Sequence, residues 1–188
     1  KENKIILIAP VPKTDQLTAE KNLHPYVFRT AANTTIEGRS VAEIISTWKE
    51  VKRVATIAPD YAYGQDVAKS FVEHIKKLRP DVEIVDQQWP KLGEADYTPF
   101  INAQMAKKPE AVFSALWGGH LVAWAKQAKP LGFFDLVQSR VVNGGEAGSV
   151  EVSRALGPDY PFGIWGNSYD LASYEGQPES HKKYIERI

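Results

Sequence analysis

The chain has 188 residues, of which 43% are apolar and 24% are charged, a composition typical of a folded globular protein. Lysine plus arginine number 23 and aspartate plus glutamate number 23, so we do not expect a nucleic-acid partner, which requires a basic excess. The absence of cysteine excludes thiol catalysis, disulfides and cysteine-ligated zinc. No apolar run approaches the roughly 18 residues that span a bilayer. The chain contains no signal peptide and begins at Lys1, so we expect processing or truncation upstream.

Short apolar runs alternate with stretches of helical spacing along most of the chain. Five runs, mostly of β-branched residues, predict buried strands at residues 5–8, 53–58, 82–85, 111–116 and 140–142. Apolar residues at helical spacing predict helices through residues 41–48, 67–78 and 121–131. Because the middle strands begin about one βα unit apart, residues 35–150 are predicted to form a doubly wound α/β domain with an open parallel sheet.

Local signals predict how individual helices begin or end. Thr98, followed by a proline, predicts an N-cap, and Gly132 predicts a C-cap with positive φ. Lys76, Lys77 and Arg79 form the densest basic stretch. We interpret this stretch as a solvated face whose charge suits a helix C-terminus.

The two flanks do not complete a domain by themselves. Residues 1–30 hold a strand (5–9), a turn-rich connection and a second extended piece (26–29). Residues 158–175 are rich in glycine, proline and aromatic residues, with an extended piece at 162–165. We interpret both flanks as parts of a second domain whose remainder lies outside this chain.

Loops at the carboxyl ends of parallel strands converge on one edge of the sheet and bind ligands there. Four such loops carry aromatic residues, glycines and isolated carboxylates: residues 59–64, 89–97, 117–120 and 143–148. Tyr63 offers a flat apolar face and a hydroxyl donor. Glu146, on a glycine-flanked loop, either pairs with a ligand ammonium or is an exposed loop acid. The alternative is that the glycines only form turns and the aromatic residues only cover the edge of the core. Four such loops on one rim favour a ligand site instead.

The sequence carries no complete enzyme motif. The glycine-rich segment at 144–148 lacks the Lys-Ser/Thr of a P-loop and does not match GxGxxG, and no GxSxG nucleophile elbow occurs. The four histidines lack metal-ligand spacing among themselves; we interpret His74 as structural, while His120 lies on the expected rim. We therefore expect no catalytic residue, no metal and no cofactor, and we do not expect an enzyme.

Five short motifs occur in order along the chain: Tyr-Val-Phe-Arg-Thr at 26–30, Glu-Gly-Arg-Ser-Val-Ala at 37–42, Lys-Arg-Val-Ala at 52–55, Asp-Tyr-Ala-Tyr-Gly at 60–64 and Ala-Val-Phe at 111–113. Over most of residues 5–150 the sequence resembles the type I periplasmic binding proteins of the branched-chain amino acid (Leu/Ile/Val) class. Those proteins are extracellular solute-binding components of ABC importers. The resemblance implies a periplasmic or extracellular location, with or without a lipid anchor, and a membrane permease as partner.

The resemblance also implies a domain layout. Residues 1–30 would end ligand-binding domain one, and residues 31–160 would form domain two with the hinge entry. Residues 161–188 would hold the strand that crosses back and the start of a return helix, at 178–188. The chain would then correspond to about half of a family member. It would lack the first part of domain one, including a serine-bearing loop that holds the ligand carboxylate.

Two ligand contacts of the family match residues of the rim. The tyrosine before the glycine of the Tyr-Gly motif matches Tyr63, and the ammonium-binding glutamate matches Glu146 after a small loop insertion. The family's aromatic residue after the Gly-Gly turn falls on His120, a departure that makes Trp117 an alternative source of the ring.

A third ligand contact is implied in the loop at residues 9–14. We expect Val11 there, with either Lys13 or Thr14 at the position where family members usually have small or hydroxyl residues. Lys13 is a departure from that pattern. It would either pair with a ligand carboxylate or point into solvent.

The leading hypothesis is that the protein captures an amino acid or similar small polar solute by hinge closure. One alternative keeps the fold but binds an aromatic or aliphatic carboxylate, with contacts from Trp117, Trp89, Lys13 and His120. Another makes the chain the ligand-sensing domain of a receptor or regulator, and an enzyme ranks last.

Overall fold

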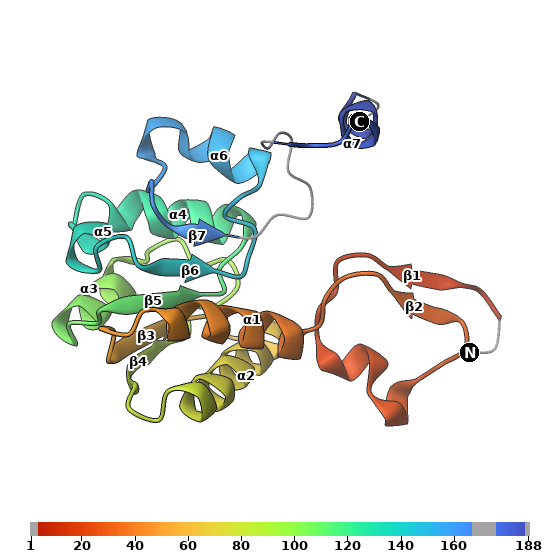
Figure 1. The fold of residues 1–188 in the computed structure, drawn as a ribbon, viewed down its shortest axis with the longest axis horizontal. Helices are drawn as coiled ribbons and strands as arrows, with labels where there is room; N and C mark the ends of the chain where they lie inside the picture. The colour runs from red at the N-terminus through yellow and green to blue at the C-terminus, as the bar shows by residue number, and fades with distance from the viewer. Residues whose placement is uncertain (1–3, 167–175, 187–188) are drawn as a thin grey trace.

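A computed structural model describes residues 4–166 and 176–186. Its centre is a parallel sheet in which the strands lie in the order β4-β3-β5-β6-β7 (Figure 1). These strands are β3 (Arg53–Ile57), β4 (Glu83–Gln88), β5 (Ala111–Ser114), β6 (Val141–Asn143) and β7 (Trp165–Gly166). The predicted doubly wound α/β fold is confirmed. The extended piece predicted at 162–165 begins later, at Trp165, because Gly163 turns the chain with a φ of 89°.

Helices cover both faces of this sheet, as a doubly wound fold requires. One face is covered by α1 (Thr34–Thr47) and α2 (Ala62–Leu78). The other is covered by α3 (Thr98–Ala106), α4 (Gly118–Ala128), α5 (Phe133–Leu136) and α6 (Val150–Leu156). The remaining helices are the 3-10 turns η1 (Asp15–Thr18), η2 (Glu20–Asn22) and η3 (Gly157–Asp159), and α7 (Glu179–Ile185).

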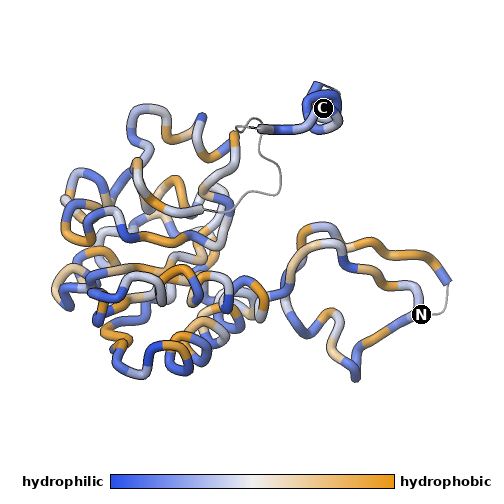
Figure 2. Tube along the Cα trace, viewed as in Figure 1, coloured by the Kyte–Doolittle hydropathy of each residue, from blue (hydrophilic) through white to orange (hydrophobic). Residues whose placement is uncertain are grey.

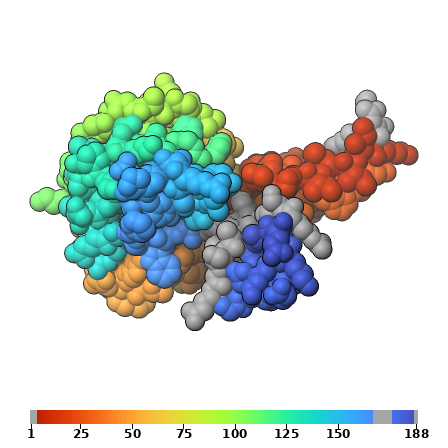
Figure 3. Space-filling model, turned by 90° about the horizontal axis from the view of Figure 1, so that it is seen from above, coloured from red at the N-terminus to blue at the C-terminus, as the bar shows by residue number. Residues whose placement is uncertain are grey.

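The residues before α1 form an arm that projects from the rounded α/β body (Figure 3). Its strands β1 (Leu7–Ala9) and β2 (Val27–Arg29) pair in parallel, and both are apolar along much of their length (Figure 2). Leu7 and Ile8 are nevertheless 53% and 60% exposed. The prediction of a buried strand over 5–8 is therefore wrong for the described residues, because β1 pairs with β2 alone and no layer covers it.

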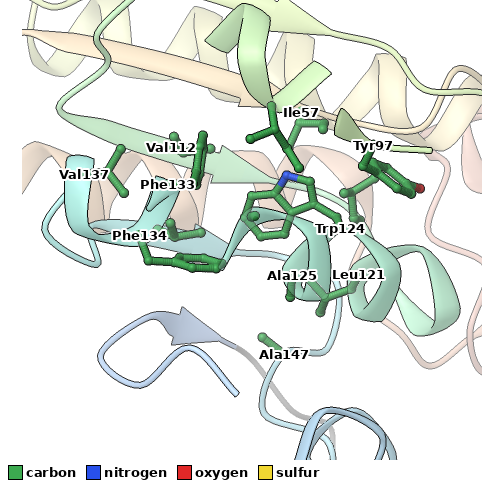
Figure 4. Close-up of a cluster of buried hydrophobic side chains, with 14 of the residues drawn as sticks. Ile57, Tyr97, Val112, Leu121, Trp124, Ala125, Phe133, Phe134, Val137 and Ala147 are labelled. Atoms are coloured by element: carbon green, nitrogen blue, oxygen red, sulfur yellow. The ribbon is translucent and has the colours of Figure 1, made fainter. Parts of the chain in front are cut away.

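Two apolar clusters lie on opposite faces of the central sheet, because side chains alternate along each strand. Ile57 belongs to the cluster beneath α3 and α4, whereas Val54 belongs to the cluster beneath α1 and α2. Trp124 is fully buried in the first cluster. Its ring meets Phe133 and Phe134 edge-on, with centroids 5.5 and 5.4 Å apart (Figure 4). These cores give the loops at the sheet edge a rigid base.

Both predicted helix caps differ from the structure. Helix α3 begins at Thr98 itself, and the Thr98 N–H donates to the Asp96 carboxylate at 3.0 Å. The prediction of Thr98 as N-cap is wrong because Tyr97 is the cap residue and Thr98 is already the first residue of the helix. Gly132 has the expected positive φ of 72°, but α4 already ends at Ala128 and Gly132 leads into α5 instead.

The basic stretch at the end of α2 is only partly solvated. Its two lysines lie in the last helical turn, but Arg79 is buried. The Arg79 guanidinium donates to the carbonyls of Trp48 and Val51 at 3.2 and 3.0 Å and to the Asp81 carboxylate at 2.9 Å. The interpretation as a solvated face is wrong for Arg79, because the carbonyls that follow α1 need donors.

Candidate ligand-binding site

A cavity of about 380 Å³ opens where the arm meets the α/β domain. The arm contributes residues 11–14, the start of α2 contributes residues 61–63, and the loops before α4 and α6 contribute Trp117 and residues 145–146. The domain segments follow the carboxyl ends of β3, β5 and β6. The cavity thus lies at the sheet edge where ligands gather in this class of fold.

The structure brings five of the six expected contact residues to this cavity: Val11, Lys13, Tyr63, Trp117 and Glu146. His120 lies outside its lining. The His120 Nδ1 is 2.6 Å from the Tyr97 hydroxyl, and its Nε2 accepts the Gly93 N–H at 3.2 Å. Trp89 likewise packs against the core beneath α2. No described residue of the loop at 89–97 lines the cavity.

Glu146 is held by a buried asparagine at the end of β6. The Asn143 Oδ1 accepts the N–H groups of Gly145 and Ala147, each at 3.0 Å, while its Nδ2 donates to the Leu116 carbonyl at 2.9 Å. Between these anchors Glu146 adopts a φ of 78°, a left-handed conformation that persists only where the surroundings impose it. A Cβ on Gly145 would lie 2.2 Å from the Leu116 carbonyl oxygen, so this loop position requires glycine.

The arm loop at 11–14 is held by hydrogen bonds to its backbone carbonyls and from the Thr14 side chain. The Arg29 guanidinium, from β2, donates to the Thr14 carbonyl at 2.7 Å, and the Lys13 carbonyl accepts the Thr34 N–H at 2.9 Å. The Thr14 hydroxyl donates to Asp66 on α2 at 3.0 Å. The arginine of the Phe-Arg-Thr motif therefore shapes the loop that lines the cavity.

A buried ion pair joins the arm to the domain beside the cavity. The Lys13 Nζ lies 2.6 Å from the Glu37 Oε2, and their side chains are only 8% and 4% exposed. The Tyr63 hydroxyl donates to the other oxygen, Oε1, at 2.6 Å. Burial raises the pKa of Glu37 above its ordinary 4.5, while the charge of Lys13 opposes that rise. Because both carboxylate oxygens face donors, the ionised form of Glu37 fits this arrangement.

Aromatic side chains form one wall of the cavity. The Trp117 Nε1 donates to the Tyr61 hydroxyl at 3.2 Å, and the rings of Tyr61 and Tyr63 lie 5.9 Å apart. Trp117 remains 39% exposed. The wall therefore offers apolar ring surface with few polar atoms, which suits a hydrocarbon or aromatic part of a ligand.

Glu37 and Asn143 are functional-site residues that the sequence alone did not predict. Glu37 lies four residues before Val41 and eight before Ile45, so helical spacing places it on the apolar face of α1. A carboxylate in that position signals a buried partner. Asn143 directly follows an apolar strand and precedes two glycines, which is a weaker signal because the same pattern occurs in ordinary turns.

Residues 4–166 and 176–186 gather no group of three potential metal ligands. Over the same residues, none of the helices has the length and apolar character needed to cross a membrane.

Comparison with known proteins assigns the family. A family model described as "Periplasmic binding protein" matches residues 1–178. The chain belongs to the periplasmic binding protein family. The predicted resemblance to the Leu/Ile/Val class is confirmed by a curated relative, Leu/Ile/Val-binding protein homolog 4 of Brucella abortus, which is 27% identical over 119 residues. That match covers 62% of this chain and 28% of the relative.

Solved structures share the fold of this periplasmic binding protein chain. An amino acid ABC transporter substrate-binding protein from Pseudomonas fluorescens Pf-5 superposes with a TM-score of 0.77 at 19% identity, covering 97% of this chain and 47% of the other. A solute-binding protein of an ABC transporter from R. palustris, in complex with 4-hydroxybenzoate, also gives 0.77 at 17% identity, covering 99% and 49%. The chain therefore spans about half of these structures and a smaller part of the Brucella relative.

Proposed function

We propose that this chain is part of the solute-binding component of an ABC importer, and that its cavity forms one half of a ligand-binding cleft. Residues 1–30 then end ligand-binding domain one, residues 31–160 form domain two, and residues 161–188 lead back to domain one. The importer's membrane permease is the expected partner. The protein acts in the periplasm or outside the cell and carries out no chemical reaction.

The observation that carries the proposal is the position of Glu146. A buried asparagine holds its loop in a left-handed conformation at the edge of an apolar cavity. A carboxylate placed in this way suits the ammonium group of an amino acid or a similar small polar solute. The aromatic wall with Tyr63 and Trp117 then packs against the ligand's carbon skeleton.

Capture proceeds by closure of the two domains over the ligand. The arm loop at 11–14 and the domain loop at 145–146 both line the cavity, so a ligand bound there contacts residues of both domains. Closure removes water from the polar contacts, which strengthens them because water no longer competes for the same groups.

The aromatic wall supports a second ligand class, the aromatic carboxylates. In that case Trp117 and Tyr61 would stack on the ring, and Lys13 would face the carboxylate. The two ligand classes make opposite predictions for substitutions. For an aromatic carboxylate, Lys13→Ala should weaken binding more than Glu146→Gln does, whereas for an amino acid the order is reversed.

A thermal-shift panel on the full-length gene product tests the proposal. The panel contains amino acids beside aromatic and aliphatic carboxylates. A ligand that binds only the folded state stabilises it by about 2.7 kcal/mol at a hundredfold excess over its Kd. We expect a clear shift with amino acids. A shift confined to carboxylates without an amine would move the proposal to the second class, and no shift with any compound would contradict solute binding by these classes.

A further inference from the structure

The Lys13–Glu37 ion pair borders two cavities. Lys13 lines the ligand cavity and also a second cavity of about 210 Å³, whose lining includes Glu37 and Gly144. The pair is almost fully enclosed, since the two side chains are 8% and 4% exposed. A ligand in the first cavity would therefore contact Lys13, whereas Glu37 does not line that cavity.

The surroundings of Glu37 are built to hold a carboxylate in this position. One oxygen accepts from Lys13 and the other from the Tyr63 hydroxyl, both at 2.6 Å. Gly144 makes room for the group, because a Cβ there would lie 2.5 Å from the Glu37 Oε1. The Lys13 ammonium also donates to the Gly144 carbonyl at 3.3 Å and lies 5.9 Å from the centre of the Tyr63 ring. Glu37 is therefore the fixed counterion of Lys13.

The Lys13–Glu37 pair changes the net charge of the surface that faces a bound ligand. Among the described residues that line the ligand cavity, Lys13 is the cation and Glu146 is the acid. With Glu37 ionised, the positive charge of Lys13 is balanced by its neighbour, which weakens the attraction that Lys13 exerts on an anion in the ligand cavity. In a site shielded from water, the loss of this attraction acts strongly on a charged ligand group.

We propose that Glu37 is a specificity-determining residue that neutralises Lys13 and thereby makes this half of the cleft reject ligands with an additional carboxylate. The proposal rests on ligand binding at this cavity, as proposed above. A lysine without that counterion would attract such a carboxylate as a point charge. Specificity then comes from leaving the added carboxylate of the wrong ligand without a partner, as well as from contacts to the right ligand.

The test compares two pairs of ligands, in each of which one member carries an additional carboxylate, using the full-length protein and isothermal titration at neutral pH. L-Leucine is paired with L-glutamate, and benzoate with terephthalate. Glu37→Gln keeps the shape and one of the two acceptor oxygens but removes the charge. We expect the ratio of the Kd of the dicarboxylate to the Kd of the monocarboxylate to fall by at least about tenfold in this variant.

Two further variants keep the test decisive if Glu37→Gln does not fold. Lys13→Gln leaves the acid without its cation and should shift the same ratio in the opposite direction. The double variant K13Q/E37Q removes both charges and should return the ratio to within about threefold of the wild type. Glu151→Gln, an equal charge change at an exposed position of α6, is the matched control and should leave the ratio unchanged.

The outcomes separate this inference from the proposed function. If the wild type binds none of the four compounds, ligand binding by these classes is contradicted and the inference fails with it. If the wild type binds at least one of the two pairs but Glu37→Gln weakens both members of that pair equally or leaves their ratio unchanged, only the role of Glu37 is overturned. A fall in the ratio with recovery in the double variant supports the role.

Discussion

The α/β domain and the N-terminal arm contain similarly apolar strands, yet only the domain buries them. Every residue of β5 is buried, whereas Leu7 and Ile8 of β1 are more than half exposed. Within the described residues, the strand β5 has a neighbour on each side and helices over both faces, while β1 pairs with β2 alone. A two-stranded sheet is marginally stable at best. Burial thus depends on how many layers surround a strand rather than on its composition.

The junction between the two regions is polar. The arm contacts the domain through the Lys13–Glu37 pair, the Thr14–Asp66 hydrogen bond and a hydrogen bond from the Thr35 hydroxyl to Asp15. Polar contacts of this kind specify a position but contribute little net free energy compared with an apolar core. We therefore expect the domain to carry the stability and the junction to carry the binding site.

The largest expected effect comes from the domain core. Trp124→Ala should destabilise the chain by about 3–5 kcal/mol because it opens a cavity among well-packed rings. The matched arm substitution, Phe28→Ala, removes a ring that is half exposed, and should cost less than about 1 kcal/mol. Urea unfolding of both variants of this chain measures the difference.

Equal costs for the two substitutions would contradict the comparison between core and arm. Measuring the same two substitutions in the full-length gene product extends the comparison between core and arm. If the remainder of domain one covers the arm there, the cost of Phe28→Ala should rise towards that of a core position.

The next largest loss of stability is expected when a buried arginine is replaced. Arg79→Met should destabilise by about 2–3 kcal/mol, because it leaves several carbonyls around the end of α1 without their charged donor. Arg29→Met, at a half-buried position of the arm, should cost about 1 kcal/mol by the same principle. Urea unfolding again measures both. A larger cost at Arg29 than at Arg79 would show that the arm, not the domain, depends more on its charged donor.

A smaller, pH-dependent effect is expected at Asp81. Hydrogen bonds from Arg79 and Lys52 hold the pKa of Asp81 well below its ordinary 3.8. Because the folded pKa is depressed, the carboxylate contributes stability above pH 3.8, and that contribution is lost as the pH falls further. Asp81→Asn should therefore lower stability at neutral pH and flatten its acid dependence. Thermal melting across a pH series would contradict this if both proteins lost stability in parallel.

Much of the fold could be predicted from the sequence because it rests on local periodicity. The alternation of apolar runs such as 111–116 with helical spacing marks a doubly wound sheet without any knowledge of its partners. The exposure of β1 could not be predicted in this way, since it depends on what surrounds the strand. Local composition likewise gave no sign that Arg79 is buried.

Residues of the candidate site could be predicted only where they belong to a short local motif. Tyr63 and Glu146 stand in short glycine-containing motifs, and both line the cavity. Glu37 pairs with Lys13, 24 residues away, and Asn143 fixes its loop against Leu116, 27 residues away. Such pairings follow from the folded topology, which brings separate strand ends together, and no local pattern encodes them.

The role of Glu146 as the ammonium-binding residue is tested most directly by titrating Glu146→Gln with the amino acid that gives the largest thermal shift on the wild type. Glu151→Gln, five residues later in the chain, is the matched control. We expect Glu146→Gln to weaken binding by more than tenfold, about 1.4 kcal/mol, while Glu151→Gln binds as the wild type does. An unchanged Kd for Glu146→Gln would contradict the assignment of this cavity as the ammonium site.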